Sequence, residues 1–252
     1  MNVFLTGASS GIGLALAREF AGRGARLGLV ARRRATLEDL DRELGGRHLA
    51  YDVDVTDRSA LFAAARAFEA DSGGTDVAIA CAGISTGVRT EYEEDLDVFR
   101  DVVDINLVAM ASTFSPFIAP MRARRRGTLV GIASVAGIRG LPGSGAYSAS
   151  KAGVIAYCES LRGELWPSGV RVVTICPGYI DTPLTQGNRY GMPFLMKADD
   201  FAARAFEAIA AGRSYRVIPW QMGVVAKLLR ALPDAVFDRL LAGRPRKQRR
   251  SG

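Results

Sequence analysis

The stretch NVFLTGASSGIGLALAREF, residues 2–20, decides the fold. Its first five residues form an apolar run that predicts a short buried strand. Residues 12–25 repeat apolar side chains at helical spacing and end in glycines, as helices do. Between them, TGASSGIG at residues 6–13 lets backbone N–H groups approach an anion at a helix N-terminus. Its G-x-x-x-G-x-G spacing differs from the G-x-G-x-x-G dinucleotide fingerprint, so the turn alone indicates only a candidate phosphate-binding loop.

The same alternation of strand and helix continues along the chain. Apolar strands that alternate with helices predict an α/β fold: one doubly wound Rossmann-like domain, with a mostly parallel seven-stranded sheet and helices on both faces. We expect this domain to span residues 1–220, and residues 221–252 to form a helical extension with a basic tail rather than an independent domain. The other expected strands are 26–31, 48–55, 76–83, 127–134, 170–178 and 215–220, and the other helices are 35–46, 58–74, 96–124, 146–166 and 199–212.

Composition limits the classes of function. The chain has 252 residues, 48% hydrophobic and 23% charged, as in an ordinary soluble protein. No apolar run reaches the roughly 20 residues of a membrane span, and no secretory signal pattern opens the chain. Three scattered cysteines indicate a reducing compartment, so we expect a cytoplasmic protein. The single histidine, His48, excludes a multi-histidine metal site, and we expect no metal.

The positive charge is concentrated at one end. The formal net charge is +7, and the segment GRPRKQRR at residues 243–250 carries five of these charges. The body of the chain has no basic stripe interleaved with aromatic residues, so we expect no nucleic-acid partner.

Tyr147 and Lys151 lie four residues apart in GAYSASKAG, residues 145–153. That spacing makes the side chains neighbours on one helix face. A phenol ionises near pH ~10, and a nearby cation favours the phenolate and lowers that pKa. The pair is a candidate proton donor and acceptor, although an isolated Y-x-x-x-K is more often a chance arrangement on a helix surface.

A series of motifs then gives this pair a context. TGASSGIG, DVDVTD, ACAG, DINLVA, GIASVAG, YSASK and PGYIDT follow one another along the chain. In this order they resemble the short-chain dehydrogenase/reductase family over roughly residues 2–220. The resemblance implies a nicotinamide-dependent oxidoreductase that assembles as a homodimer or homotetramer.

The resemblance also implies which residues hold the cofactor. Asp54 and Val55 match an adenine contact, and Ile180 and Thr182 match positions that hold the nicotinamide carboxamide. Cys81 departs from the family pattern, which has an asparagine that ties neighbouring strands together. The implied set is Gly7, Ser9, Ser10, Gly11, Ile12, Gly13, Asp54, Val55, Ala82, Gly83, Tyr147, Lys151, Pro177, Gly178, Ile180 and Thr182.

The end of the second strand indicates the cofactor type. NAD-binding relatives usually carry an acidic residue there for the ribose hydroxyls, whereas this chain reads LVARRR. Arg32 and Arg33 suit a 2′-phosphate, with help from Ser9, so we expect NADP(H) in preference to NAD(H). The alternative is that these arginines simply begin the next helix in solvent.

By resemblance, four residues form the catalytic group. Ser134 donates to a substrate carbonyl oxygen, and Tyr147 supplies or removes the proton. Lys151 lowers the pKa of the phenol and binds the nicotinamide ribose, while Asn106 bends a helix and holds a water in a proton relay. We therefore expect reversible hydride transfer between nicotinamide and a carbonyl or secondary alcohol.

Two features of the chain suit other functions. GISTG at residues 83–87 fits the nucleophile elbow of serine hydrolases, but those enzymes need a histidine after the serine, and His48 precedes Ser85. The main alternative is a non-catalytic NADP-binding regulator or scaffold on the same fold.

The C-terminal part of the chain contains a predicted substrate lid and a predicted surface helix. Residues 184–196 are expected to form a substrate lid, and its apolar residues predict a lipophilic small molecule. In the extension, Val224, Val225, Leu228, Leu229 and Leu232 fall on one helical face. That face and the basic tail suit peripheral contact with an anionic membrane. Such a helix more often packs on its own domain or a subunit, with the basic end as a solvated tail.

Overall fold

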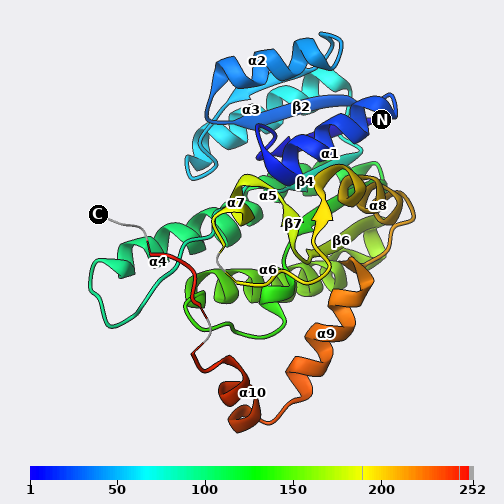
Figure 1. The fold of residues 1–252 in the computed structure, drawn as a ribbon. Coiled ribbons are helices and arrows are strands. Elements are labelled where there is room, and N and C mark those ends of the chain that lie inside the picture. Colours follow the sequence, from blue (N-terminus) through cyan, green and yellow to red (C-terminus); the bar gives the residue numbers. More distant parts are fainter. Residues whose placement is uncertain (189, 244, 250–252) are drawn as a thin grey trace.

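The computed structural model describes residues 1–188, 190–243 and 245–249. Its centre is a seven-stranded sheet in the order β3-β2-β1-β4-β5-β6-β9, in which all neighbours are parallel. This arrangement confirms the predicted doubly wound sheet (Figure 1). Its strands are β1 Asn2–Thr6, β2 Arg26–Ala31, β3 Leu49–Asp52, β4 Val77–Ala80, β5 Gly127–Ile132, β6 Val170–Pro177 and β9 Tyr215–Ile218.

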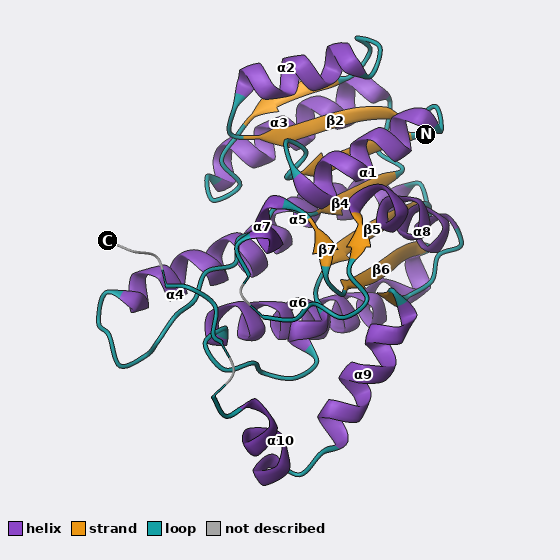
Figure 2. Cartoon of the chain, in the orientation of Figure 1, coloured by secondary structure: helices purple, strands orange, loops and turns teal. Residues whose placement is uncertain are grey.

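Helices connect the strands and form two outer layers (Figure 2). The α-helices are α1 Gly11–Gly22, α2 Arg34–Glu43, α3 Arg58–Ser72, α4 Asp95–Val103, α5 Ala109–Ala123, α6 Gly145–Leu165, α7 Pro183–Gln186, α8 Ala198–Ala210, α9 Trp220–Ala231 and α10 Asp234–Leu241. Shorter elements are a π-helical turn, η1 Asp104–Val108, and the 3-10 turns η2 Val135–Gly137 and η3 Trp166–Ser168.

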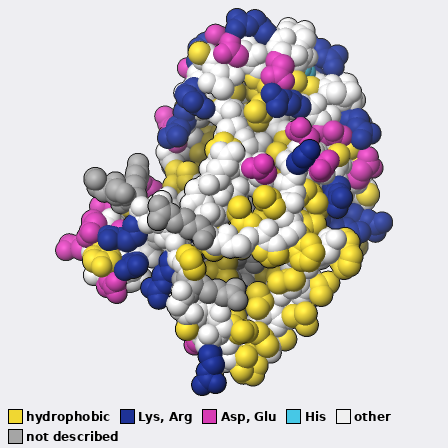
Figure 3. Space-filling model, in the orientation of Figure 1, with side chains coloured by type: hydrophobic (Ala, Val, Ile, Leu, Met, Phe, Trp, Pro, Cys, Tyr) yellow, Lys and Arg dark blue, Asp and Glu magenta, His cyan; other side chains and the backbone are white. Residues whose placement is uncertain are grey.

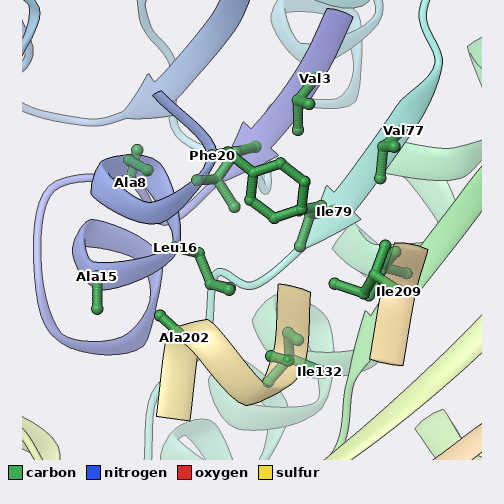
Figure 4. Packing of buried hydrophobic residues seen from close by; sticks show 14 of the residues in the cluster. Val3, Ala8, Ala15, Leu16, Phe20, Val77, Ile79, Ile132, Ala202 and Ile209 are labelled. Atoms are coloured by element: carbon green, nitrogen blue, oxygen red, sulfur yellow. The ribbon is translucent and has the colours of Figure 1, made fainter. Parts of the chain in front are cut away.

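Alternate side chains of the strands bury both faces of the sheet. Val3 and Leu5 of β1 join the cluster formed with α1, α2 and α8, which Figure 4 shows around Leu16 and Phe20. Phe4 points to the opposite face and joins the cluster formed with α3, α5 and α6. Strands buried on both sides explain the near-continuous apolar runs in the sequence.

The helix predicted at residues 96–124 is present, and it is unusual in its length and apolar composition. Residues Asp95–Ala123 form a continuous helix that is long and apolar enough to cross a membrane by length and composition alone. Its α5 part is packed against the sheet through Phe114, Phe117 and Met121, which are fully buried. Core helices pass the same composition test, so the helix is weak evidence for a membrane span.

The segment predicted as a lid is tied down at both ends. Ile180 and Asp181 form β7, Met196 and Lys197 form β8, and the two short strands pair in parallel. Thr182 begins α7 as part of a capping box with Thr185. The pairing therefore holds the two ends of the 184–196 segment together.

The extension begins with helix α9, whose apolar residues are divided between two faces. Helix α9 lies on the domain through Met222, Gly223 and Ala226, which are buried. Val224 and Leu228, which belong to the predicted apolar face, are 48% and 64% exposed. Helix α9 therefore contacts its own domain, one of the alternatives that the sequence left open, while part of the predicted apolar face points outward.

The basic tail also differs from the prediction of a solvated end. Residues 245–249 run back from α10 and lie beside the start of α4 (Figure 1). Gly87 N–H donates to the carbonyl oxygen of Gln248 at 2.8 Å. Arg244 and Arg250 of the predicted tail lie outside the described residues.

Candidate active site

A cleft of about 490 Å³ opens at the carboxyl edge of the sheet. The carboxyl ends of parallel strands meet at this edge, which is where doubly wound sheets bind ligands. All but two of the predicted site residues line it, the exceptions being Arg33 and Asn106. The lining residues among the predicted set are Gly7, Ser9, Ser10, Gly11, Ile12, Gly13, Arg32, Asp54, Val55, Ala82, Gly83, Ser134, Tyr147, Lys151, Pro177, Gly178, Ile180 and Thr182.

The glycine loop leaves an open helix terminus at one end of the cleft. Ser10 is the N-cap of α1, yet its side chain makes no capping hydrogen bond to the N–H groups of the first turn. A Cβ on Gly13 would lie 2.0 Å from the carbonyl oxygen of Gly7, and Gly7 itself has φ +74°. The loop therefore needs glycine at these positions to bring backbone close to a bound phosphate.

Three consecutive arginines follow β2, and each has a different environment. Arg34 pairs with Glu38 at 2.7 Å and with Asp52 at 3.3 Å. Arg33 is the N-cap residue of α2 and lies outside the cleft wall. Arg32 lines the cleft, and no ion pair joins it to any residue that the structure describes. Of the two predicted phosphate ligands, the structure places only Arg32 in the wall.

Asp54 and Val55 follow β3 in the cleft wall. Both the backbone N–H and the hydroxyl of Thr56 donate to Asp54 Oδ1, at 2.9 and 2.7 Å. The backbone bond, helped by the hydroxyl and by the charge of Arg32, lowers the pKa of Asp54. The carboxylate is therefore fixed as an ionised acceptor beside the predicted adenine position.

Thr6 holds the strand ends together where the family asparagine is missing. The N–H groups of Cys81 and Ala82 both donate to Thr6 Oγ1, at 3.1 and 3.3 Å. Burial raises the pKa of the Cys81 thiol to about 12, so this side chain is an inert hydrophobic group. The β1–β4 junction is intact without the asparagine.

Ser134 and Tyr147 face the cleft from η2 and α6. Ser134 Oγ accepts a hydrogen bond from Ala136 N–H at 3.1 Å, and this bond does not use the hydroxyl proton of Ser134. Burial raises the pKa of the Tyr147 phenol, and a hydrogen bond with Ser134 partly offsets this effect. The sequence predicted that Lys151 lowers the pKa of Tyr147. In the structure the pKa is raised instead, because desolvation of the phenol has the larger effect.

Lys151 is almost completely buried, with 5% of its surface exposed. Its Nζ donates to the carbonyl oxygen of Ile132 at 2.7 Å and lies 5.8 Å from the centre of the Tyr147 ring. Burial lowers the pKa of Lys151 to about 8. The carbonyl at the end of β5 thus fixes the ammonium below the phenol without a direct ion pair.

Asn106 sits in the π-helical turn between α4 and α5, which agrees with the predicted bend. Its Oδ1 accepts from Ile84 N–H at 2.8 Å, and its Nδ2 donates to Ile84 O and to Ser150 Oγ, both at 3.0 Å. Asn106 is 2% exposed and lies behind the cleft wall. It joins the segment after β4 to helix α6, which carries Tyr147.

The other end of the cleft contains residues that the motifs did not indicate. Ile84, Leu141, Tyr179, Leu184 and Tyr190 provide apolar surface there, with Ser85, Ser144 and Asn188 as polar neighbours. Burial raises the pKa of Tyr190 to about 12. Of the apolar lid residues, only Leu184 and Tyr190 are in the wall, whereas Phe194 and Leu195 are 50% and 47% exposed.

The C-terminal segment contributes Lys247 to the same end. This residue belongs to no recognised motif, and the sequence grouped it with a solvated basic run. A local pattern could not have revealed it, because residues 83–95 hold the segment in place from far away in the sequence.

The serine hydrolase hypothesis is not supported, because Ser85 and His48 do not line the same site. Ser85 lines the cleft, whereas His48 lies at the start of β3, where its Nδ1 accepts from Leu27 N–H at 3.1 Å. His48 is buried in that position and is not part of the cleft wall. Among the described residues, no cluster of His, Cys, Asp or Glu could hold a metal ion.

Comparisons with known proteins agree with this geometry. The family model for short chain dehydrogenases matches residues 1–192. An uncharacterized oxidoreductase of Myxococcus xanthus is 38% identical, over 93% of both chains. Mouse dehydrogenase/reductase SDR family member 7B is 33% identical over 99% of this chain and 82% of its own length. A crystal structure of a short-chain dehydrogenase from Streptomyces avermitilis superposes with a TM-score of 0.80, at 25% identity and 95% coverage of both chains.

Proposed function

The chain belongs to the short-chain dehydrogenase/reductase family of oxidoreductases, and from this premise we propose that it transfers hydride reversibly between NADP(H) and a small molecule. The reacting group is the carbonyl or secondary alcohol of a lipophilic substrate. One observation carries this proposal: Ser134, Tyr147 and Lys151 converge on one cleft whose opposite end is a glycine-lined helix terminus.

Tyr147 is the proton donor in the reducing direction. Its raised pKa keeps the phenol protonated at neutral pH, as a donor requires. Hydride addition to a carbonyl creates an alkoxide that is far more basic than a phenolate, so proton transfer from Tyr147 is favourable. The Lys151 ammonium then stabilises the phenolate that remains, because opposite charges attract strongly in a buried site.

Ser134 acts on the carbonyl oxygen before that transfer. The bond from Ala136 N–H uses only a lone pair of the Ser134 oxygen, so the hydroxyl proton can turn from Tyr147 to a substrate carbonyl oxygen. A donor aimed at an oxygen that gains negative charge stabilises the transition state more than the ground state. In the oxidising direction the Ser134 hydroxyl holds the alcohol oxygen, and the phenolate form of Tyr147 accepts the hydroxyl proton of the alcohol.

The residues present fit a nicotinamide dinucleotide, which supplies the hydride when bound. The uncapped first turn of α1 suits the pyrophosphate, and Asp54 and Val55 suit the adenine end. Ile180 and Thr182 suit the nicotinamide end, and Lys151 can donate to the ribose. Asn106 keeps its proposed place in a proton relay, from behind the wall next to Lys151.

NADP(H) is the proposed cofactor because Arg32 lines the cleft and forms no ion pair with a carboxylate of the described residues. A guanidinium without a partner is suited to a 2′-phosphate, whereas an adenosine ribose without that phosphate would leave it unpaired. Arg33 lies outside the wall and is given no direct role.

A substrate screen tests this function against the scaffold alternative. We expect aliphatic and aromatic ketones and aldehydes to drive NADPH consumption, with NADH used much less well. Tyr147→Phe should abolish turnover while NADPH binding, followed by fluorescence, stays intact. Carbonyl-independent NADPH binding with no turnover on any substrate would support a regulator or scaffold instead.

A further inference from the structure

Residues 245–249, here called the C-terminal strap, are fixed to the rim of the cleft. The Gly87 N–H donates to Gln248 O at 2.8 Å, and Gly87 and Arg249 form a parallel bridge. A Cβ on Gly87 would lie 2.3 Å from the carbonyl oxygen of Lys247. Gly87 does not have a positive φ, so its lack of a side chain serves this close approach rather than a turn.

A buried ion pair holds the end of the strap. Arg249 donates to both oxygens of Asp95, at 2.8 and 2.9 Å, and to Glu94 at 2.8 Å. Asp95 is only 2% exposed, and Arg89 N–H donates to it at 2.7 Å. The Arg249 guanidinium also lies 3.8 Å from the centre of the Tyr92 ring. A carboxylate this deeply buried needs its partner, so the anchor indicates a docked segment rather than a free tail.

The docked strap places Lys247 in the cleft wall without a counterion. Its Nζ donates to Leu184 O at 3.4 Å, and no carboxylate among the described residues lies within ion-pair distance of it. The side chain is half-buried, and burial lowers the pKa of its ammonium. A partly desolvated cation without a negative partner is costly, and an anionic ligand group would offset that cost.

We propose that Lys247, delivered by the C-terminal strap, recognises a carboxylate at the end of the substrate remote from the reacting carbonyl. The apolar wall of Ile84, Leu141, Leu184 and Tyr190 would hold the chain between the two groups. The substrate class is then a lipophilic oxo or hydroxy acid. This inference rests on the proposed function, since it assigns the far end of the same site.

Binding of unreactive probes tests the inference separately from turnover. Octanoate and octanamide have the same shape and differ in charge, and their affinities for the NADPH complex can be measured by calorimetry. We expect octanoate to bind at least tenfold more tightly than octanamide. Lys247→Met should remove this difference by weakening octanoate alone, and Lys247→Arg should retain most of it.

Two further variants separate the strap from general damage. Gly87→Val places a side chain where the strap backbone lies, so it should remove the octanoate preference while Lys247 is still present. Lys227→Met, which removes an exposed lysine of α9, should change nothing. If Lys247→Met loses NADPH affinity and Lys227→Met does not, the ammonium binds a cofactor phosphate and the proposal is overturned.

Failure of the inference and failure of the function give different results. A preference for octanoate that survives in Lys247→Met, equal binding of the two probes, or no binding of octanoate would contradict the inference even if ketones are reduced. Loss of the preference in Lys247→Met without any ketone turnover would support the anion site and count against the oxidoreductase proposal.

Discussion

Lys151 brings a positive charge into a position that excludes water. Burial lowers its pKa from 10.5 to about 8, so the charged form is disfavoured in the folded protein. The bond to the Ile132 carbonyl satisfies one of its three donors. Lys151 therefore lowers the folding stability of the protein at neutral pH. Desolvated groups in active sites commonly have this effect.

The first prediction concerns this cost. Between pH 8 and 10.5 the unfolded chain binds more protons at Lys151 than the folded one, so the free energy of unfolding rises with pH. The full difference corresponds to about 3 kcal/mol. Lys151→Met should abolish this rise, so its stability relative to the wild type should be highest near neutral pH and fall toward pH 10.

Urea unfolding of the cofactor-free protein at several pH values measures this effect. Lys227→Met is the matched control, because Lys227 is exposed and should leave the pH dependence unchanged. Parallel pH profiles for the wild type and Lys151→Met would show that the buried amine is charged equally in both states.

The second prediction concerns the choice of cofactor. Arg32→Ala should weaken NADPH binding by about 10- to 100-fold, the range for a hydrogen bond to a charged group, and leave NADH binding nearly unchanged. Arg34→Ala is the control, because Arg34 is paired with Glu38 and Asp52 away from the cleft. Fluorescence titration gives both affinities, and an equal loss for the two cofactors would refute the 2′-phosphate assignment.

At the scale of the element, helix α1 packs against the preceding glycine loop where Gly13 approaches Gly7. A Cβ on Gly13 would lie 2.0 Å from Gly7 O, so Gly13→Ala must push the helix from the loop. We expect a loss of about 1–3 kcal/mol in stability, as for other overpacked sites, and a weaker NADPH complex.

Gly22 provides the comparison within the same helix. A Cβ there would meet nothing within 4 Å, so Gly22→Ala should be neutral or stabilising by up to about 1 kcal/mol. Thermal unfolding of the two variants decides the point. Equal effects of the two substitutions on stability would mean that the close approach of Gly13 to Gly7 adds no cost, and would contradict the prediction.

Elements that depend on local pattern were predictable, and those that depend on distant partners were not. The apolar runs predicted β1 and β2 at their observed bounds, because a strand that is buried on both faces has apolar residues at consecutive positions. The β7–β8 pair was missed because two-residue strands have no periodicity. The strap was missed because its composition resembles a solvated tail, while Gly87 and Asp95 determine where it lies.

The candidate site shows the same division. The order of motifs indicated Ser134, Tyr147 and Lys151, and the structure brings them to one cleft. The direction of the Tyr147 pKa could not be read from the i, i+4 spacing, because desolvation is a property of the packed surroundings. For the same reason the sequence could not distinguish Arg32, in the wall, from Arg33, outside it.

On the scale of the whole molecule, the outer face of the extension is unusually apolar. Trp220, Val224, Leu228, Val236 and Leu240 are between 46% and 67% exposed. Figure 3 shows hydrophobic side chains gathered over the part of the surface where α9 and α10 lie. Strand β9, at the edge of the sheet, precedes α9 directly. Apolar patches of this kind commonly mark interaction surfaces.

The last prediction assigns this face to a second copy of the chain, in line with the expected homodimer or homotetramer. Val224→Glu with Leu228→Glu should weaken self-association roughly tenfold or more, because the contact would bury unpaired carboxylates. Light scattering after size exclusion measures the mass, and Leu96→Glu, at an exposed apolar residue of α4, is the control. A co-sedimentation assay with anionic phospholipid vesicles tests the membrane alternative. If the double variant keeps its mass but loses vesicle binding, the face contacts a membrane and the assignment to a second copy is wrong.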